Sequence, residues 1–283
     1  MAFTIPPVAA PAKQLFSLVG KTAVITGGSG DMGFTVSKYL LQAGASLALI
    51  DNNLPKLEPA ASSLSEWYKT YRQENNEPED SKQIISSWAC DISDVAQVKS
   101  TMEAIRKHHA KPLDVLINTA GYCENVTALD YSPLNLKRIV DVNLNGSMFV
   151  ATEFARTLIA DNHPGSVILV ASMSGSIVNH PQPQTPYNMT KAGVIHMAKS
   201  LSAEWAKHNI RVNSLSPGYI MGPLTKKVME ADADLGNTWM SRVPMDRMAD
   251  PSEFAGPIIF MASDASSYMN GHDLVVDGGY SVW

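Results

Sequence analysis

The sequence has few of the features that mark secreted, membrane-spanning or nucleic-acid-binding proteins. Among its 283 residues only Cys90 and Cys123 are cysteines, too few for a disulfide framework, and both follow apolar segments. We therefore expect buried, reduced thiols. No apolar run approaches the length of a membrane span. The net charge of −5 and the isoelectric point near 5.8 argue against nucleic acid or an anionic membrane as the main partner.

Neither end of the chain resembles a targeting signal. Residues 1–17 contain three prolines and lack a basic region followed by a continuous apolar core, so we interpret them as an N-terminal arm and not as a signal peptide. The C-terminal residues Gly-Tyr-Ser-Val-Trp match no peroxisomal or endoplasmic-reticulum retention signal. We therefore expect a cytoplasmic protein. No metal site is predicted.

Short apolar runs alternate with longer segments of helical character from Lys21 onward. Strands that alternate with helices are typical of a parallel sheet covered by helices on both faces. The predicted fold is therefore α/β, a doubly wound parallel sheet of about seven strands. Residues 18–283 are predicted to form a single domain, because no linker or repeat divides them. The seven predicted strands are Thr22–Thr26, Ser46–Ile50, Ile84–Ala89, Leu113–Ile117, Ser166–Ala171, Ile210–Leu215 and Leu274–Val276.

Two insertions interrupt this alternation. Residues 66–83 are polar and charged, which is typical of a solvated extension of the helix and loop between the second and third strands. Residues 219–249 contain apolar and adaptable side chains, among them Met221, Trp239 and Met245. These side chains can serve packing alone. Because the segment follows the carboxyl end of a strand, where open α/β sheets bind ligands, we predict that it forms a substrate lid.

A glycine-rich turn after the first strand predicts a dinucleotide site. The segment Thr26–Gly33 reads TGGSGDMG, and its glycines let backbone amides approach a pyrophosphate at the start of the next helix. Asp51 ends the second strand, where it can accept hydrogen bonds from both hydroxyls of an adenosine ribose. It would repel a 2′-phosphate and no Arg or Lys immediately follows it, so NAD(H) is favoured, although NADP(H) is not excluded. The alternative role for Asp51 is that of a helix cap or turn former.

Polar and small residues also follow the third and fourth strands. Asp91 comes after the third strand, where it can bond an adenine amino group, and the turn 118–121 after the fourth is expected to line the cofactor. Asn143 stands among apolar neighbours in the next predicted helix, which raises the question of its hydrogen-bond partner. A surface position or a satisfied core position is the alternative for this asparagine.

Tyr187 and Lys191 form a Tyr-x-x-x-Lys pair, and Ser172 lies fifteen positions before the tyrosine. In the helix predicted over 186–208, Tyr187 and Lys191 lie one turn apart on one face. An ammonium group stabilises phenolate, so this pairing helps to make a tyrosine usable for proton transfer. Ser172 can hold the carbonyl oxygen of a substrate beside the Tyr187 hydroxyl. A Tyr-x-x-x-Lys pattern alone is equally compatible with an ordinary amphipathic helix.

These motifs together resemble those of the short-chain dehydrogenase/reductase family, and the resemblance implies a Rossmann-type fold. It covers nearly the whole chain from Leu18. The segments LFSLVGK and IHMAKSLSAEWA look closest to the fungal branch that contains NADP-dependent mannitol dehydrogenase and sorbose reductase. The motifs that match in order and spacing are the glycine loop 26–33, Asp91, NTAG at 118–121, Asn143, Ser172, YNMTK at 187–191, RVNSLSPGYI at 211–220 and DLVVDGGY at 273–280.

The resemblance also assigns roles to individual residues. Tyr187 would donate the proton in reduction and remove it in oxidation, and Lys191 would lower the tyrosine pKa and bond the nicotinamide ribose. Ser172 would hold the substrate oxygen, and Asn143 would keep a water that relays protons to Lys191. These four form the implied catalytic tetrad. The implied cofactor contacts are Gly27, Ser29, Asp31, Met32, Gly33, Asp51, Asn52, Asp91, Ile92, Asn118, Ala120, Gly121, Tyr187, Lys191, Pro217, Gly218 and Ile220.

Three positions depart from the family pattern. Asp31 replaces the middle glycine of the usual TGxxxGxG, which puts a carboxylate near the expected pyrophosphate. It can weaken binding by repulsion, or turn outward and cap the helix, and we favour the cap. Gly222 replaces a threonine that would bond the carboxamide, and Thr119 replaces the second asparagine of NNAG. Sugar-reductase relatives typically lack an acid at the position of Asp51, so their NADP preference need not transfer to this chain.

The resemblance implies an oxidoreductase that transfers a hydride between a nicotinamide cofactor and a ketone or secondary alcohol. The expected substrate is a polyol/ketose pair or a secondary-metabolite carbonyl. The alternative is a non-redox protein on the same scaffold, such as a cyclase, an isomerase or a cofactor-binding module. His180 and Trp239 are candidate substrate contacts. Gln182, Gln184 and Asn188 can also bond the hydroxyls of a sugar, and a solvated loop position is the alternative for these three residues and for His180. The resemblance also suggests a homotetramer with an interface over 133–160, 186–208 and the C-terminal segment.

Overall fold

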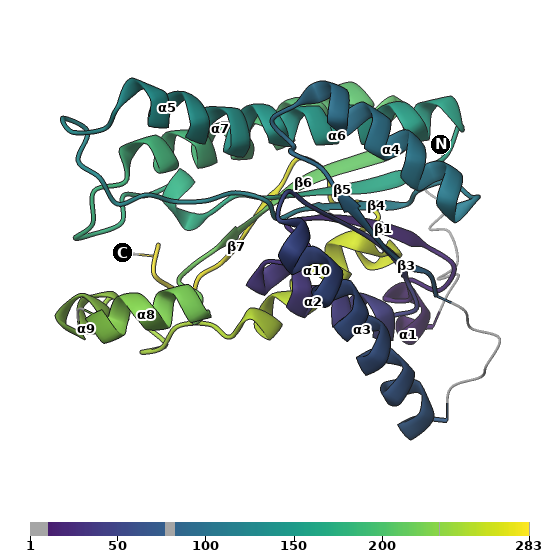
Figure 1. Ribbon diagram of the computed structural model, residues 1–283, viewed down its shortest axis with the longest axis horizontal. Coiled ribbons are helices and arrows are strands. Elements are labelled where there is room, and N and C mark those ends of the chain that lie inside the picture. The colour runs from purple at the N-terminus through teal and green to yellow at the C-terminus, as the bar shows by residue number, and fades with distance from the viewer. Residues whose placement is uncertain (1–10, 77–82, 232, 283) are drawn as a thin grey trace, which may run out of the picture.

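The short apolar runs of the sequence form the strands of one parallel sheet. The computed structural model describes residues 11–76, 83–231 and 233–282 (Figure 1). The spatial order of the strands is β3-β2-β1-β4-β5-β6-β7, so the winding direction reverses between β1 and β4. Ligands of such sheets bind at the carboxyl ends of the strands beside this reversal. The strands are β1 (Thr22–Thr26), β2 (Ser46–Asp51), β3 (Ile85–Ala89), β4 (Val115–Asn118), β5 (Gly165–Val170), β6 (Ile210–Pro217) and β7 (Asp273–Val276).

All seven predicted strands are present; β1 has the predicted bounds, and the ends of the others differ from the prediction by at most two residues. One difference is at β6, which continues to Pro217 instead of ending at Leu215. The extra residues stay extended because Ser214 to Pro217 pair in register with β7. This pairing joins residues about 60 positions apart in the sequence. A local sequence pattern therefore could not predict the longer strand.

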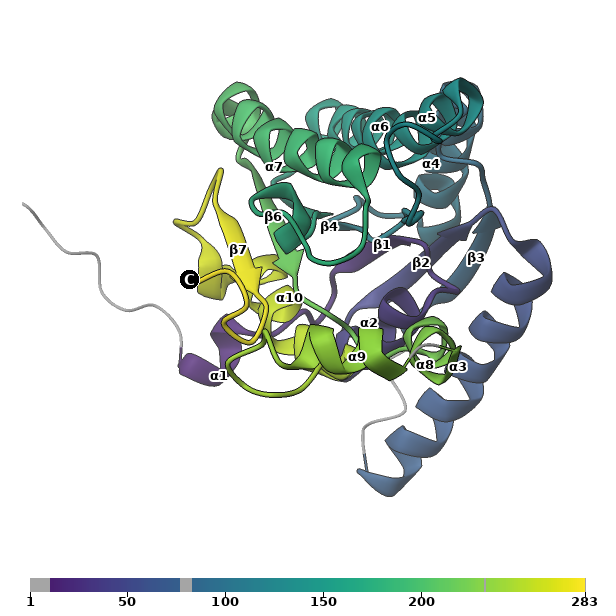
Figure 2. The same cartoon turned by 90° about the vertical axis from the view of Figure 1, so that its left-hand side faces the viewer.

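Helices cover both faces of the sheet, as Figures 1 and 2 show. Both faces of the strands are therefore buried, which explains why they read as continuous apolar runs and not as alternating ones. One layer contains α2 (Asp31–Gln42), α3 (Leu54–Glu74) and α10 (Ala255–Ala262), and the other contains α4 (Val95–His109), α5 (Pro133–Val140), α6 (Ser147–Ala160) and α7 (Thr185–Trp205).

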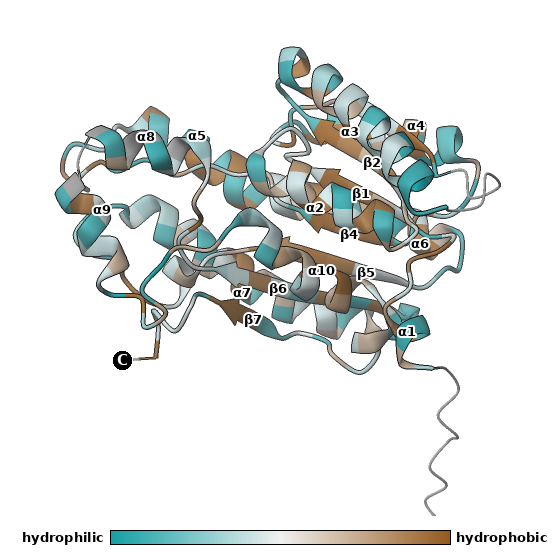
Figure 3. Ribbon diagram, turned by 90° about the horizontal axis from the view of Figure 1, so that it is seen from below, coloured by the Kyte–Doolittle hydropathy of each residue, from teal (hydrophilic) through white to brown (hydrophobic). Residues whose placement is uncertain are grey.

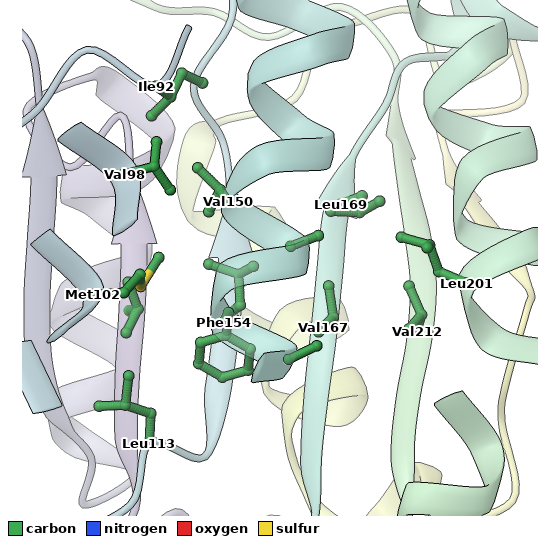
Figure 4. Packing of buried hydrophobic residues seen from close by; sticks show 14 of the residues in the cluster. Ile92, Val98, Met102, Leu113, Val150, Phe154, Val167, Leu169, Leu201 and Val212 are labelled. Carbon is green, nitrogen blue, oxygen red and sulfur yellow. The ribbon is translucent and has the colours of Figure 1, made fainter. Parts of the chain in front are cut away.

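The two layers enclose two apolar cores, one on each side of the sheet. Figure 4 shows the core beneath α4 and α6, where the ring of Phe154 lies between Met102 and Val167. Phe154 is fully buried. In Figure 3 the strands are hydrophobic, and the helices that cover them are largely polar on their outer surfaces. Among the described residues, no helix has both the length and the apolar character needed to cross a membrane.

The two predicted insertions and the arm occupy the periphery. Residues 66–74 extend α3, as predicted, while residues 77–82 lie outside the described part of the chain. The segment 219–249 forms α8 (Pro223–Ala231) and α9 (Ala233–Met240) after the carboxyl end of β6 (Figure 1). Within the arm, residues 12–15 form the short helix α1 (Ala12–Leu15), and residues 1–10 are not described.

Candidate active site

The glycine loop packs so tightly that side chains have no room at two of its positions. Gly27 has a φ of +65°, and a Cβ there would lie 2.8 Å from the Thr119 Oγ1. A Cβ on Gly33 would lie 2.3 Å from the Gly27 carbonyl oxygen. The Thr119 hydroxyl donates to the Thr26 carbonyl at 2.6 Å, so this departure from the family pattern ties the turn after β4 to the end of β1.

A cavity of about 450 Å³ opens between this loop and the ends of the neighbouring strands. It contains most of the predicted cofactor contacts, namely Gly27, Ser29, Asp31, Met32, Gly33, Asp51, Asn52, Asp91, Ile92, Ala120 and Gly121. Two basic residues that the motif analysis missed, Lys56 and Arg138, also line it. Lys56 escaped notice because it follows Asp51 by five positions and reaches the cavity from the first turn of α3.

Six of the predicted contacts do not line this cavity. Asn118 is buried, and its side chain accepts from the Thr26 hydroxyl at 2.6 Å and donates to Ser147 at 2.8 Å. It therefore links the end of β4 to the end of β1 and to α6. The remaining five, which belong to β6, the loop after it and α7, are Pro217, Gly218, Ile220, Tyr187 and Lys191.

Asp51 is already part of a hydrogen-bond network. Its Oδ2 accepts from the amide of Ser29 at 3.1 Å and from the Ser29 hydroxyl at 2.7 Å, and its Oδ1 accepts from the Asn53 amide at 3.0 Å. An ionised carboxylate has about four acceptor sites, so one remains for a further donor. The turn-forming and ribose-binding roles of Asp51 are therefore compatible.

The cavity fits a nicotinamide dinucleotide. Glycines whose added Cβ atoms would collide with the loop leave the backbone amides free to approach a phosphate, and the first turn of α2 adds partial positive charge. Asp51 and Asp91 supply acceptors at the ends of β2 and β3. This donor set matches the polar groups of a pyrophosphate, a ribose and an adenine.

Tyr187 and Lys191 lie one turn apart on α7, as the spacing predicted. The Lys191 ammonium is 5.7 Å from the centre of the Tyr187 ring and donates to the Val170 carbonyl at 2.8 Å. Ser172 follows β5, donates to the Ser174 hydroxyl at 3.0 Å, and shares a hydrogen bond with Tyr187. The end of β5 and the start of α7 thus bring the three side chains together.

The predicted pKa shift of Tyr187 is wrong in direction for the cofactor-free protein. Burial raises the pKa of Tyr187 to about 12, and the hydrogen bond with Ser172 opposes this only in part. Burial also lowers the pKa of Lys191 to about 8. Desolvation therefore disfavours the charged form of both side chains.

Asn143 is fully buried in a π-helical segment, Asp141–Gly146, between α5 and α6. Its side chain accepts from the Tyr122 amide at 3.0 Å and donates to the Tyr122 carbonyl at 2.9 Å, which answers the question of its partner. A Cβ on Gly121 would lie 3.1 Å from the Asn143 Oδ1 and 3.5 Å from the Lys191 Nζ. The side chains of Asn143 and Lys191 therefore both reach the turn after β4. A π-helical turn inside a helix is frequent at functional sites.

Comparisons with known proteins agree with this geometry. The family model described as "Enoyl-(Acyl carrier protein) reductase" matches residues 29–281. A D-arabinitol 2-dehydrogenase (ribulose-forming) of Candida tropicalis is 51% identical over 269 residues, which cover 95% of each chain. An NADH-dependent L-xylulose reductase of Ambrosiozyma monospora is 44% identical over 270 residues, 95% of this chain and 97% of the relative. A sorbose reductase of Candida albicans is 36% identical over 272 residues, 95% and 89% of the two chains.

A solved structure is similar over the same length. The short-chain type dehydrogenase/reductase from Mycobacterium marinum is 33% identical, has a TM-score of 0.84, and is matched over 95% of this chain and 98% of that one. The chain belongs to the short-chain dehydrogenase/reductase family. The resemblance predicted from the motifs is confirmed, including the likeness to fungal polyol enzymes, among which the sorbose reductase is more distant than the arabinitol dehydrogenase.

Membership of this family fixes the class of reaction. The protein is an NAD(P)-dependent oxidoreductase that acts on secondary alcohols and ketones. The alternative of a non-redox protein on the same scaffold finds no support among these relatives. The catalytic roles of Asn143, Ser172, Tyr187 and Lys191 stay a prediction from the sequence motifs.

Beside Ser172 the dehydrogenase has a network of uncharged polar side chains, which includes Gln182, Gln184 and Asn188. The Ser174 hydroxyl contacts the carboxamide of Asn179, and Gln184 donates to Ser174 at 3.0 Å and to Asn188 at 2.8 Å. Gln182 donates to the Tyr219 hydroxyl at 3.0 Å. The only sequence signal for this network was the run of amide side chains between Ser172 and Tyr187.

The two predicted substrate contacts differ in their surroundings. Trp239 is buried, stacks on Tyr219 with ring centres 5.0 Å apart, and donates its Nε1 hydrogen to Gln182 at 2.8 Å. It therefore connects α9 to the polar network. The side chain of His180 is exposed, and only its backbone amide forms a described hydrogen bond, to Tyr280 at 3.5 Å.

Two further expectations were wrong. Asp31 is exposed and is the first residue of α2, but the cap position belongs to Gly30 and the carboxylate accepts no hydrogen bond from the helix. Cys90 is buried as expected, whereas Cys123 is exposed. The apolar strand before Cys123 ends at Asn118, so the cysteine lies in the open loop that follows it.

Proposed function

We propose that this dehydrogenase oxidises a secondary hydroxyl of an uncharged polyol to a ketone, reduces the ketose in the reverse direction, and prefers NAD(H). The network beside Ser172 carries this proposal. Its amides and hydroxyls offer donors and acceptors to a polyhydroxy chain, and none of its members has the charge that a carboxylate or phosphate substrate would need. The names of the relatives, a D-arabinitol 2-dehydrogenase and an L-xylulose reductase, agree with a five-carbon polyol or ketose.

The proposed mechanism divides the work among four side chains. A bound nicotinamide supplies the hydride acceptor or donor. The Tyr187 hydroxyl exchanges a proton with the reacting oxygen of the substrate, and Ser172 holds that oxygen by a hydrogen bond. Lys191 holds the ribose and returns the proton toward solvent. Asn143 keeps the loop at Tyr122 in place, and it is proposed to hold the relay water beside Lys191.

The proposed cofactor preference depends on Asp51. Its negative charge disfavours a 2′-phosphate at the end of β2, and the NADH-dependent relative at 44% identity agrees with this. Lys56 lines the same cavity, and its positive charge would attract a 2′-phosphate. It would therefore reduce the preference for NAD(H) over NADP(H). NADP(H) therefore remains a weaker alternative.

The remaining features of the proposal concern the whole chain. Residues 18–283 act as one catalytic domain, with residues 219–249 as a lid whose Trp239 contacts the polar network that would receive substrate. The protein is proposed to be a cytoplasmic homotetramer that acts on a small molecule. Exposed apolar side chains on α5, α6 and α7 support self-association, namely Leu134, Leu136, Met148, Ile159 and Met189.

The test compares initial rates for neutral polyols and a sugar acid with both oxidised cofactors. D-Arabinitol, xylitol, mannitol and galactitol should be oxidised at least tenfold faster with NAD⁺ than with NADP⁺, and D-gluconate should react poorly because its carboxylate finds no cation. A Lys56→Ala variant should lose most of any activity with NADP⁺. Faster turnover of gluconate, or a preference for NADP⁺, would refute the respective part of the proposal.

A further inference from the structure

Two residues from distant parts of the chain compete for one space beside the dinucleotide cavity. Asp31 begins α2, and Gly222 immediately precedes α8. A Cβ on Gly222 would lie 2.5 Å from the Asp31 Oδ2 and 3.4 Å from its Cγ. Real Cβ atoms essentially never approach another atom so closely. Any side chain at residue 222 would therefore have to push the exposed end of the Asp31 side chain out of this position.

The backbone at Gly222 is fixed by its own hydrogen bonds. Its amide donates to the Ile220 carbonyl at 3.0 Å, and its carbonyl accepts from Lys226 at 2.9 Å. Ile220 pairs with Ala249 in an isolated bridge, and the Met221 amide donates to Ala249 at 2.8 Å. A side chain added at position 222 would therefore have to displace the Asp31 carboxylate and not the backbone.

The Asp31 carboxylate has no partner that holds its charge. No hydrogen bond or ion pair joins it to any residue in the described part of the chain. By contrast, the carboxylates of Asp94 and Asp250, which precede helical segments, accept backbone amide hydrogens. Asp31 is exposed and lines the cavity, beside the turn whose amides are placed for phosphate. Its negative charge therefore lies where it would repel the phosphates of a bound dinucleotide.

We propose that Asp31 and Gly222 form one coupled determinant of dinucleotide affinity. The carboxylate fills the space of the side chain that position 222 lacks, and it places a negative charge beside the pyrophosphate site that weakens binding. The inference rests on the dinucleotide site of the proposed function. Asp31 and Gly222, the two departures from the family pattern in this region, then form one feature. The Asp31 carboxylate occupies the space beside residue 222, and the glycine at 222 leaves that space free.

The charge is tested with Asp31→Asn, which keeps the shape of the side chain. The dissociation constant of NADH is measured by fluorescence titration of the cofactor-free protein. At a partly exposed site the loss of one opposing charge should tighten NADH binding about fivefold to tenfold. The gain should shrink at high salt, since screening weakens the repulsion in the unmodified protein. Glu103→Gln, which removes an exposed charge from α4 away from the cavity, is the matched control and should leave binding unchanged.

The coupling is tested with Gly222→Ala, Asp31→Ala and the double variant. Gly222→Ala alone should lower the melting temperature of the cofactor-free protein slightly, because the new methyl group must displace the end of the exposed Asp31 side chain and meets no backbone atom among its three nearest contacts. In the Asp31→Ala background the same change should have little effect, so the two effects are not additive. The melting temperature makes this test independent of catalysis and of cofactor binding.

The outcomes separate this inference from the proposed function. Additive melting temperatures, or an unchanged NADH affinity in Asp31→Asn, would overturn the coupled determinant and leave the dehydrogenase intact. Binding by Asp31→Asn but not by the unmodified protein would support the inference in its strongest form. Failure of every variant to bind either NADH or NADPH would refute the proposed cofactor site, and with it this account of Asp31.

Discussion

At the scale of single residues, burial determines the properties of the site. Lys191 is only 5% exposed, and its one described hydrogen bond is to a neutral carbonyl. The folded protein therefore disfavours the charged form of Lys191, to which we assign a catalytic role, and such a cost in stability is typical of functional sites. The raised pKa of Tyr187 has the same cause.

We expect Lys191 to make stability depend on pH in the alkaline range. Its pKa is about 8 in the folded protein and 10.5 for an ordinary lysine, so between these values the unfolded chain holds a proton that the folded one lacks. Stability then rises with pH through this window. The difference in unfolding free energy between Lys191→Met and the unmodified protein should change by about 2 kcal/mol between pH 7 and 10, in favour of the unmodified protein at high pH. Urea denaturation measures it, and a difference that is constant with pH would contradict the assigned shift.

A second prediction concerns Asp51 and cofactor choice. Asp51→Asn removes the charge that disfavours a 2′-phosphate, so the ratio of kcat/KM with NADH to that with NADPH should fall at least tenfold. Ser29→Ala is the control, because it removes the 2.7 Å hydrogen bond to the same carboxylate and leaves the charge in place. An equal fall in both variants would show that loop geometry, and not charge, sets the preference.

At the scale of elements, α9 is joined to the loop before α7 by one side-chain pair. The Trp239 Nε1 donates to Gln182, and the indole stacks on Tyr219. Gln182 also bonds the Tyr219 hydroxyl, so α9, the loop after β6 and the loop before α7 meet at these three side chains. This junction lies in the network that we assign to substrate.

Trp239→Phe removes the hydrogen bond of this junction and keeps an aromatic ring for stacking. Loss of one buried hydrogen bond should raise the KM for polyol about fivefold while the NADH dissociation constant stays unchanged. Trp88→Phe is the matched control, since it removes an indole donor to Ser86 on β3, far from the site in the sheet order. An equal effect on KM in both variants would assign Trp239 to packing alone.

The elements also show what the sequence could and could not predict. Local patterns were sufficient for the strands, the glycine loop and the Tyr187–Lys191 spacing, because each depends on residues close together in the chain. The Gln182–Trp239 pair and the Asp31–Gly222 contact join residues far apart and have no local pattern. The direction of the Tyr187 pKa was mispredicted for the same reason, since burial depends on the assembled fold.

At the scale of the whole molecule, the exposed apolar side chains of α5 and α6 predict self-association. A homotetramer should have a mass of about 120 kDa by light scattering, four times the 30.6 kDa chain. Met148→Asp on α6 should reduce this mass, because it places a charge on the face assigned to the interface. Val95→Asp on α4 is the control and should keep the tetramer, since Val95 is exposed outside the assigned interface. A monomeric mass, or no effect of Met148→Asp, would contradict the assembly.

The central claim is hydride transfer from NADH to the carbonyl carbon of a ketose, with Tyr187 as the proton donor to its oxygen, and an isotope measurement tests it most directly. NADH with deuterium at the transferable position is incubated with D-ribulose, and the product is examined by NMR. We expect a polyol with deuterium on the newly formed secondary carbon, and a rate at least about 100-fold lower for Tyr187→Phe, whose fold and NADH affinity should be retained. A product without deuterium, or a Tyr187→Phe variant with the full rate, would contradict the account.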